Sequence, residues 1–179
     1  MTSFKTRRSY NIPNHAHFLT FSCYKRFPLL DADISKRWLI DSMQAMRTTQ
    51  QVSLLAYVIM PEHAHLLIYP RTETYQISRI LAAIKRPISR LAREWYTEHD
   101  RQKLETLLVV QGDRIVFRFW QAGGRYDKNV TGTDSLNQIA EYIHANPVRR
   151  GLVESPVAWR WSSARYWSGE EGAEMMMDR

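Results

Sequence analysis

The sequence predicts an α+β domain built around an antiparallel β-sheet. Short segments rich in β-forming residues are separated by longer segments with apolar residues at helical spacing. Two strand segments follow each other directly, which is typical of antiparallel rather than parallel sheets. The 179 residues are enough for one sizeable domain. We assign residues 1–167 to it, and we expect residues 168–179 to form an acidic, flexible tail.

Strand patterns occur in two parts of the chain. Alternating or continuous apolar residues with many β-branched members predict strands at residues 15–24, 53–60 and 63–69. Pro61 and Glu62 make a tight turn between the second and third of these, so the two strands are expected to be neighbours. Further along, residues 98–103 predict a polar linker. Apolar runs at 107–110 and 115–119 then flank a Gln-Gly-Asp turn and predict a β-hairpin.

Apolar residues three and four positions apart predict three helices. Asp31 or Asp33 can cap the first helix, which runs to about Gln50. The second is a long amphipathic helix between residues 77 and 95. Pro87 lies inside this helix and is expected to kink or divide it, because proline has no backbone N–H to donate.

The last helix begins at Asp134 or the following serine. It is expected to end at Asn146, because Pro147 disfavours helical geometry in the residue before it. Its core-facing stripe consists of Leu136, Ile139, Ala140 and Ile143. At about 100° per residue, Tyr142 and Asn146 lie one above the other beside this stripe. His144 falls on the opposite flank and is not expected to join them.

The charge balance of the chain favours an anionic partner. Its 25 basic and 18 acidic residues give a net charge of +7, and nucleic acid is the commonest partner of such proteins. A merely solvated basic surface is the alternative. The charges are segregated, however, since residues 79–93 contain five basic residues and no acid. Lys5, Arg7 and Arg8 form another basic cluster, and acids gather in the tail.

Several classes of protein are disfavoured by the sequence. No apolar stretch approaches the roughly 20 residues that a membrane span needs, so no membrane partner is expected. The N-terminus lacks the apolar core of a secretory signal. Cys23 is the single cysteine, which rules out an internal disulfide and fits a reducing compartment, so we expect a cytoplasmic protein. We interpret Cys23 as an apolar filler of its strand.

Four of the six histidines occur in two His-Ala-His triplets, His15/His17 and His63/His65. Because side chains alternate along a strand, both histidines of a triplet point to one face and could bind one divalent metal ion. Half-buried polar residues of a sheet are the alternative for either pair. The second pair follows a buried strand and a proline turn on a rigid scaffold, so it is the stronger candidate. The first pair could pack beside it in the sheet.

The last helix would offer two polar groups to the same neighbourhood of the sheet. These are the phenol of Tyr142 and, one turn later, the amide oxygen of Asn146. A half-buried tyrosine and a C-terminal cap before Pro147 are the alternative interpretation of the same two residues.

Two longer motifs resemble a known family. Residues 60–67, MPEHAHLL, resemble the MP-x-H-x-H-LL segment of the IS200-like single-tyrosine transposases. Residues 142–153, YIHANPVRRGLV, resemble the YIH-x-NPV-R-x-GLV segment of their REP-associated branch. Supporting matches are Phe119-Trp120-Gln121 with Tyr126-Asp127, Ile84-Lys85-Arg86 and Trp161-Ser162-Ser163. The resemblance extends over roughly residues 10–166, and the two long motifs are specific in combination.

This resemblance implies an HUH nuclease fold, a ferredoxin-like antiparallel sheet with helices packed mainly on one face. His63 and His65 would bind a metal ion with Asn146 as a third ligand, and this donor set suits Mg²⁺ or Mn²⁺. Tyr142 would be the nucleophile that attacks a DNA phosphodiester. The implied activity is cleavage and rejoining of single-stranded DNA near hairpin (palindromic) elements through a covalent 5′-phosphotyrosine, by a monomer or a homodimer.

The same interpretation suggests roles for further residues in binding DNA and in supporting the site. DNA contacts are expected from the basic residues Lys85, Arg86, Arg90, Arg149 and Arg150, with solvation of an exposed helix face as the alternative. Asp127 could orient a metal ligand or cap a turn. Trp159, Trp161 and Trp167 could stack on bases or pack within the fold.

The chain also departs from the family pattern. It carries a hairpin at residues 104–119 where relatives often have a short connection, and Gly123-Gly124 replaces bulkier residues. These departures affect the expected preference for DNA sites more than the chemistry. The alternative function is a DNA-hairpin-binding regulator on the same fold that does no chemistry. A relaxase-type nickase is a closer alternative, disfavoured by the small size of the chain.

Overall fold

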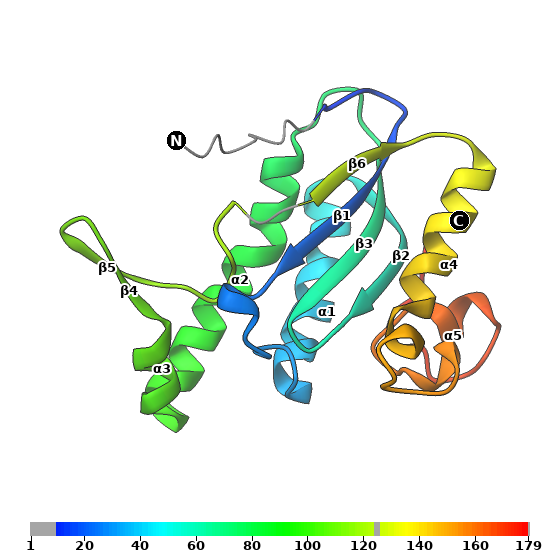
Figure 1. Ribbon diagram of the computed structural model, residues 1–179. Coiled ribbons are helices and arrows are strands. Elements are labelled where there is room, and N and C mark those ends of the chain that lie inside the picture. Colours follow the sequence, from blue (N-terminus) through cyan, green and yellow to red (C-terminus); the bar gives the residue numbers. More distant parts are fainter. Residues whose placement is uncertain (1–9, 124–125, 179) are drawn as a thin grey trace, which may run out of the picture.

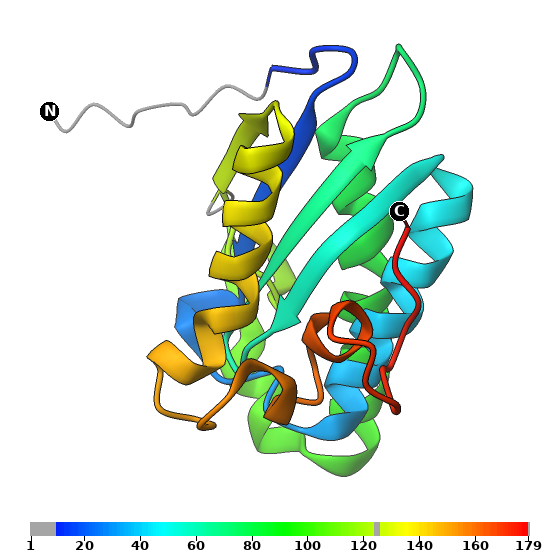
Figure 2. The same cartoon turned by 90° about the vertical axis from the view of Figure 1, so that its right-hand side faces the viewer.

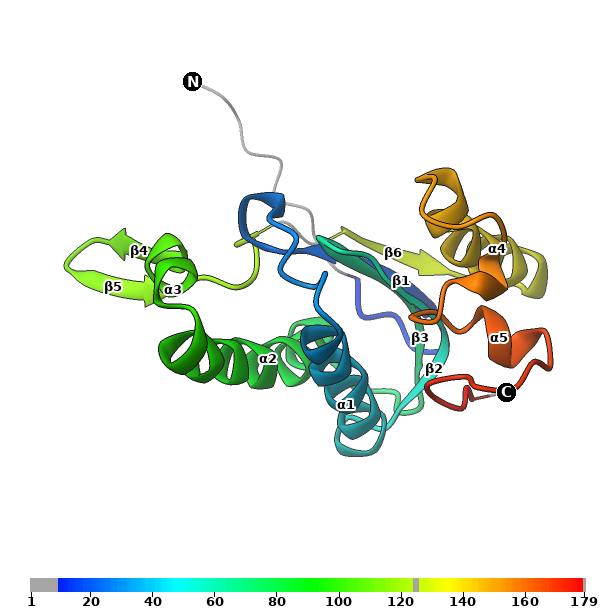
Figure 3. The same ribbon diagram turned by 90° about the horizontal axis from the view of Figure 1, so that it is seen from below.

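The computed structural model describes residues 10–123 and 126–178. Four strands form an antiparallel sheet in the order β2-β3-β1-β6: β1 (Ala16–Ser22), β2 (Val52–Ile59), β3 (His63–Pro70) and β6 (Tyr126–Val130). One face is covered by α1 (Asp33–Thr49) and α2 (Ile77–His99), and α4 (Thr133–Arg149) lies against the other (Figure 1, Figure 3). This is the predicted ferredoxin-like α+β arrangement.

The register of the strands decides which residues share a face of the sheet. β1 pairs with β3 so that Thr20 lies opposite His65 and Phe18 lies opposite Leu67. Because side chains alternate along a strand, these residues face α4. Intervening residues of β3 such as Leu66 face α1 and α2. Both histidines of β3 therefore lie on the α4 side.

The apolar core between the sheet and the helix pair α1/α2 is the larger of two. α2 buries one stripe at helical spacing, made of Ile77, Ile80, Leu81, Ile84, Ile88 and Ala92. This stripe packs with Leu19 and Phe21 of β1 and with Met43 of α1. Burial of each such side chain contributes about 2 kcal/mol, so this layer provides most of the apolar stabilisation. Cys23 is fully buried here, and burial raises the pKa of its thiol to about 12.

A smaller apolar cluster holds α4 against the sheet. Ile143 packs with Val58 of β2, Leu67 of β3 and Val130 of β6. The other predicted stripe residues, Leu136, Ile139 and Ala140, are partly buried against the same cluster. The predicted core face of this helix is therefore confirmed, and Figure 2 shows the helix lying over the sheet.

Prolines end neither of the two helices that contain them. α4 continues through Pro147 to Arg149, whereas we expected it to end at Asn146. Proline at this position leaves one carbonyl without its helical donor, but the helix closes after it, where the Arg150 N–H donates to the Asn146 carbonyl. α2 likewise runs undivided through Pro87, because its buried stripe continues on both sides.

Of the elements longer than four residues, two were not predicted. The expected polar linker at 98–103 is helical instead: α2 reaches His99, and α3 (Arg101–Leu107) follows at once. The Asp100 carboxylate caps α3 by accepting from the Lys103 N–H at 2.9 Å. β6 was missed because its sequence, YDKNV, is mostly polar and only Val130 is fully buried. It is a strand because it pairs with β1.

The predicted hairpin is present as β4 (Leu108–Gln111) and β5 (Arg114–Phe117), which project from the body together with α3 (Figure 1). Gly112 in its turn has a φ of 60°, which favours glycine. Short helices complete the chain: η1 (Tyr24–Arg26), η2 (Pro156–Ala158) and α5 (Ala164–Trp167). The basic cluster at residues 5–8 and Gly124 lie outside the described residues. Within the described ranges, no helix is long and apolar enough to cross a membrane.

The C-terminal segment packs on the domain, whereas we expected a flexible tail. Met175 and Met177 are buried. Asp178 bonds to Leu54 of β2 through both backbone and side chain, since its N–H donates to the Leu54 carbonyl and its carboxylate accepts from the Leu54 N–H. The segment thus runs beside β2, which is an edge strand of the sheet (Figure 2).

Ion pairs explain why acidic residues occur in a packed segment. The Asp178 carboxylate lies 2.6 Å from the Arg47 guanidinium. Glu174 pairs with Arg37 at 2.7 Å and also with Arg160. Two of the acids that suggested a solvated tail, Glu174 and Asp178, are therefore partners of basic side chains on the domain.

Two adjacent methionines provide a test of this packing. We expect Met177→Ala to lower the free energy of unfolding by about 2–3 kcal/mol, because the side chain is only 5% exposed. Met176→Ala is the matched control; its side chain is 69% exposed, so the change should stay within about 0.5 kcal/mol. Urea denaturation followed by tryptophan fluorescence measures both. Equally small effects would mean that the segment does not pack in solution.

Candidate active site

β3 brings its two histidines together beneath α4. His63 and His65 are each 6% exposed, and their Nε2 atoms lie 3.1 Å apart. The two rings are nearly perpendicular, with centroids 4.7 Å apart. The spacing of two along a strand thus produces the predicted pair of neighbouring imidazoles on one face.

The other nitrogen of each ring is held by a neighbouring side chain. Nδ1 of His65 lies 2.7 Å from the Thr20 hydroxyl oxygen, and Nδ1 of His63 lies 3.1 Å from Oε1 of Glu62. Because an ionised carboxylate only accepts, Nδ1 of His63 donates and its Nε2 keeps a lone pair. Neither partner was predicted: Thr20 arrives through strand pairing, and Glu62 was interpreted only as a turn residue.

Burial keeps both imidazoles neutral. It lowers the pKa of His65 to about 3, and the nearby His63 and Arg26 add to the effect. Burial also lowers the pKa of His63, although the Glu62 carboxylate opposes it. Burial alone would raise the pKa of Glu62, but hydrogen bonding from Arg150 and the proximity of His63 lower it below its usual value. Neutral imidazole is the form that binds metal ions, so both rings can act as ligands at neutral pH.

α4 places Tyr142 beside this pair. The Tyr142 ring lies edge-on to the His65 ring, with centroids 5.8 Å apart, and the residue is 40% exposed. Asn146 follows one turn later and is buried. His144 lies on the other flank, where its Nε2 is 2.8 Å from the Ser163 hydroxyl oxygen. The helix therefore separates these residues as its period predicts.

The donor groups of this site fit a divalent metal ion. Two nitrogens 3.1 Å apart are both within reach of an ion that binds imidazole at about 2.1 Å. No group of three or more His, Cys, Asp or Glu placed to hold a metal occurs in residues 10–123 and 126–178. Further ligands would therefore be oxygens of an amide, water or substrate, and Asn146 is an amide on α4. Such a mixed donor set suits Mg²⁺ or Mn²⁺.

Three arginines bring positive charge to the site. Arg150 pairs with Glu62 at 2.6 Å, and the guanidinium carbon of Arg149 lies 5.1 Å from the centroid of the Tyr142 ring. Arg26 is close enough for its charge to help lower the pKa of both histidines. Positive charge beside Tyr142 would favour the approach of an anionic group such as a phosphate. Arg149 and Arg150 were expected to contact DNA, and Arg26 was missed.

Arg26 is presented by a strained turn at the end of β1. Lys25 and Arg26 have φ angles of 50° and 55°, which are uncommon for residues with side chains. The turn is held by hydrogen bonds from the Arg26 N–H to the Cys23 carbonyl and from the Lys25 N–H to the Gln121 side chain, both 3.1 Å long. No residue type here signals such a turn, so sequence reasoning could not find it.

Comparisons with known proteins identify the family of this chain. Residues 11–146 match the family described as "Transposase IS200 like". The chain belongs to this family. Its membership makes the protein a DNA transposase, and the matched range includes His63, His65, Tyr142 and Asn146.

Solved structures extend the comparison. A REP-associated tyrosine transposase bound to a REP hairpin shares 18% sequence identity and a TM-score of 0.72, with 100% of this chain and 92% of that chain covered. A candidate transposase from Deinococcus radiodurans R1 shares 20% identity and a TM-score of 0.48, with 78% and 95% covered. The first of these similarities establishes the fold of the IS200-like transposase. Among curated proteins, none matches the chain.

The three basic residues of α2 that were expected to contact DNA do not lie at the histidine site. α2 covers the opposite face of the sheet, so Lys85, Arg86 and Arg90 are separated from the histidines by the sheet (Figure 3). The Lys85 ammonium lies 5.6 Å from the centroid of the Phe21 ring and 5.5 Å from that of Trp120. Arg86 and Arg90 are exposed. A contact with DNA at these residues would involve a second surface of the transposase.

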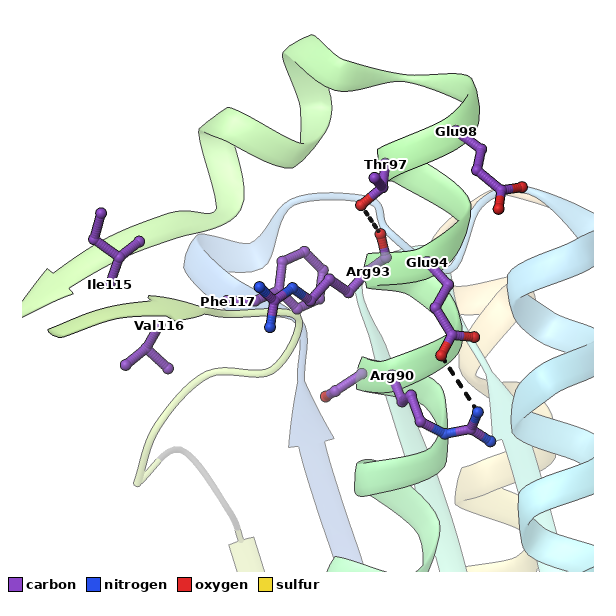
Figure 4. A pocket seen from close by; sticks show the side chains of 9 residues that line it. Arg90, Arg93, Glu94, Thr97, Glu98, Ile115, Val116 and Phe117 are labelled. Atoms are coloured by element: carbon purple, nitrogen blue, oxygen red, sulfur yellow. Dashed lines mark hydrogen bonds and ion pairs between the residues drawn. The ribbon is translucent and has the colours of Figure 1, made fainter.

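Arg90 lines a cleft between α2 and the β4–β5 hairpin (Figure 4). The cleft has a volume of about 700 Å³. It is lined by Ser89, Arg90, Arg93, Glu94, Thr97 and Glu98 of α2 and by Ile115, Val116 and Phe117 of β5. Arg90 pairs with Glu94 at 3.4 Å. Two arginines and two glutamates give the cleft no dominant charge, so it does not resemble a phosphate-binding site.

The first His-Ala-His triplet does not join the second. We considered that the two pairs could pack side by side, but β1 directs His17 to the opposite face of the sheet. There His17 is fully buried, with Nδ1 2.7 Å from Oδ1 of Asp127 and Nε2 2.7 Å from the Tyr75 hydroxyl oxygen. Asp127, for which we considered a role in orienting a metal ligand, is the partner of His17. These contacts connect β1, β6 and the segment before α2.

The three tryptophans near the C-terminus contact the protein itself. Trp159 donates its indole N–H to the Ile59 carbonyl at 3.0 Å, and Trp167 donates to the Leu55 carbonyl at 2.8 Å. Trp161 is buried, and its backbone carbonyl accepts from the Ile59 N–H. These contacts with β2 favour packing over the base stacking that we considered.

The pair formed by His17 and Asp127 predicts strong coupling between two substitutions. We expect His17→Leu to lower the free energy of unfolding of the transposase by about 3 kcal/mol, because the Asp127 side chain is only 5% exposed and loses its partner. The double variant His17→Leu/Asp127→Leu should regain most of that loss, since no buried charge remains. Urea denaturation of the wild type, His17→Leu, Asp127→Leu and the double variant measures this coupling. Losses that simply add would show that the pair has no structural role.

Proposed function

We propose that this IS200-like transposase is a metal-dependent endonuclease that cleaves and rejoins single-stranded DNA near hairpins through a covalent 5′-phosphotyrosine. One juxtaposition supports the proposal. The Tyr142 ring lies 5.8 Å from the ring of His65, whose Nε2 is 3.1 Å from that of His63. A nucleophile from a helix and a metal-binding pair from a strand thus occupy the same face of the sheet.

Tyr142 is the proposed nucleophile. Its phenolic oxygen attacks the phosphorus of a DNA phosphodiester and forms an O–P bond, while the bond from phosphorus to the 3′ oxygen breaks. The phenol loses its proton, and the departing 3′ oxygen gains one to become a free hydroxyl. The protein keeps the 5′ phosphate as an ester, so a 3′-hydroxyl can attack it, release the tyrosine and join two strands.

The remaining site residues prepare this step. His63, His65 and Asn146 would hold Mg²⁺ or Mn²⁺, which when bound polarises a phosphate and offsets developing negative charge. Thr20 and Glu62 fix the orientation of the two rings through their Nδ1 atoms. Arg149 supplies positive charge beside the tyrosine.

A DNA hairpin is the proposed partner. The REP-associated tyrosine transposase of similar fold is bound to a REP hairpin. The net charge of +7 and the arginines at the site favour a polyanion. Lys85, Arg86 and Arg90 are proposed to contact DNA that extends beyond the site. Because all proposed catalytic groups come from one chain, the proposal holds for a monomer or a homodimer.

A covalent adduct is the decisive product. The protein, Mn²⁺ and a labelled single-stranded hairpin oligonucleotide should give a protein–DNA adduct on a denaturing gel. Tyr142→Phe removes only the phenolic oxygen and should abolish the adduct. His63→Ala should slow its formation by about 100-fold or more, because a metal ligand is lost.

Tyr126→Phe is the matched control for the tyrosine. Tyr126 and Tyr142 are 38% and 40% exposed, and both rings lie edge-on to Phe18, at 5.7 Å and 5.8 Å. Tyr126→Phe should retain the adduct. An adduct that survives Tyr142→Phe and disappears in Tyr126→Phe would reassign the nucleophile. Hairpin binding without an adduct under any divalent metal would favour the regulator that does no chemistry.

The position of Arg149 predicts a salt-dependent effect on binding. Arg149→Ala should weaken hairpin binding and reduce the slope of log K against log salt by about 1, as expected for one lost phosphate contact. Arg101→Ala is the control, because Arg101 is an exposed residue of α3. Fluorescence anisotropy across a KCl series measures both slopes. Identical slopes for the two variants would remove Arg149 from the DNA interface.

A further inference from the structure

One carboxylate oxygen contacts both parts of the candidate site, which are the histidine pair of β3 and the C-terminal end of α4. Oε1 of Glu62 accepts from Nδ1 of His63 at 3.1 Å and from Nη1 of Arg150 at 2.6 Å. Arg150 is the C-cap residue of α4, and its backbone N–H donates to the Asn146 carbonyl in the last turn of that helix. The same oxygen therefore joins a residue of the metal-binding pair to the end of the helix that carries Tyr142.

Glu62 is the fixed member of this link. It lies in the turn between β2 and β3 and is 8% exposed. Its carbonyl accepts from the Cys23 N–H at 2.8 Å, and the carbonyl of Pro61 before it accepts from the Leu30 N–H at 2.8 Å. These bonds anchor the turn to the segment that follows β1. The carboxylate thus has a defined position relative to the sheet.

Arg150 is the movable member. Its side chain is 49% exposed, whereas that of Glu62 is 10% exposed, so the arginine reaches inward from the surface to a buried acceptor. The helix that it ends is held to the sheet mainly by the smaller apolar cluster around Ile143. A charge-assisted hydrogen bond at the end of such a helix constrains where the helix lies.

We propose that Glu62 is a positioning residue that couples ion binding at His63 to the position of the C-terminal end of α4. The inference rests on the proposed function. It adds a reason why ion binding by the histidine pair and the position of α4 depend on each other. The contact with Arg150 holds the carboxylate where it orients His63, so it raises affinity for the ion. By linkage, a bound ion strengthens the hold on the helix.

Mn²⁺ binding by the DNA-free protein tests this coupling without any reaction. In isothermal titration calorimetry, Glu62→Ala should weaken Mn²⁺ binding by about 10–100-fold, the usual effect of losing an outer partner of a metal-binding histidine. Arg150→Ala should weaken it several-fold although Arg150 has no contact with either ring among the described hydrogen bonds. In the Glu62→Ala background, Arg150→Ala should have no further effect, because its influence runs through the carboxylate.

Glu105→Ala is the matched control. It removes a carboxylate from an exposed ion pair with Arg101 on α3 and should bind Mn²⁺ as the wild type does. Circular dichroism confirms that each variant is folded. If Glu62→Ala does not fold, Glu62→Gln replaces it, with a smaller loss of affinity expected because one acceptor is kept. Affinity unchanged in the Glu62 variant, or an Arg150→Ala effect of equal size with and without Glu62, would overturn the coupling.

Hydrogen exchange measures how Glu62 and Arg150 affect the stability of the C-terminal end of α4. Both Glu62→Ala and Arg150→Ala should speed amide exchange in residues 142–150 several-fold and leave α2 unchanged. Unchanged exchange in α4 for both variants would overturn the proposal even if metal affinity changed.

The failure of the proposed function is distinguishable from the failure of this inference. A wild-type protein that binds no Mn²⁺ contradicts metal dependence and the coupling with it, whereas Mn²⁺ binding that is unaffected by Glu62→Ala overturns the coupling alone. Loss of the DNA adduct in Tyr142→Phe with Mn²⁺ affinity retained would support the nucleophile independently of Glu62.

Discussion

The pairing of β1 with β3 determines what the candidate site can do. It sets Thr20 opposite His65, so that the hydroxyl oxygen lies 2.7 Å from Nδ1 of the ring. A shift of this register by one residue would turn both histidines away from Tyr142, because side chains alternate along a strand. The larger apolar core on the other face prevents such a shift, since it would expose Leu19 and Leu66. Apolar burial on one face of the sheet therefore determines which polar side chains lie on the other face, beside Tyr142.

Local periodicity is the part of this site that sequence could predict. The spacing of two between His63 and His65 places both rings on one face, whatever the strand pairs with. The helical period puts Tyr142 and Asn146 on one flank of α4 and His144 on the other. Family resemblance added the roles of these residues, and the fold that it implied is the one observed. Periodicity also predicted the stripe that α2 buries.

Features that depend on contacts between distant segments could not be predicted. Thr20 reaches His65 through strand pairing, and Glu62 reaches His63 from a turn. Arg26 comes near the site because Lys25 and Arg26 have left-handed backbone conformations, which these residue types do not signal. β6 is polar in sequence and becomes a strand only because β1 offers it an edge. Charge clustering along the sequence did not indicate which face of the sheet the basic residues would cover. The basic segment 79–93 is contiguous in sequence, but its helix covers the face opposite the site.

The two helical layers are held to the sheet unequally, and this bears on access to the site. His63 and His65 are each 6% exposed and Asn146 is 8% exposed. Under the proposed function, direct contact of a phosphodiester with them would require α4 or its side chains to move. Movement of α4 disturbs the smaller apolar cluster and leaves the core between the sheet and α1/α2 intact. Local opening takes place where the least apolar surface is lost. The ion pair between Glu62 and Arg150 lies at one end of that helix, so opening there requires breaking a charged contact as well as apolar ones.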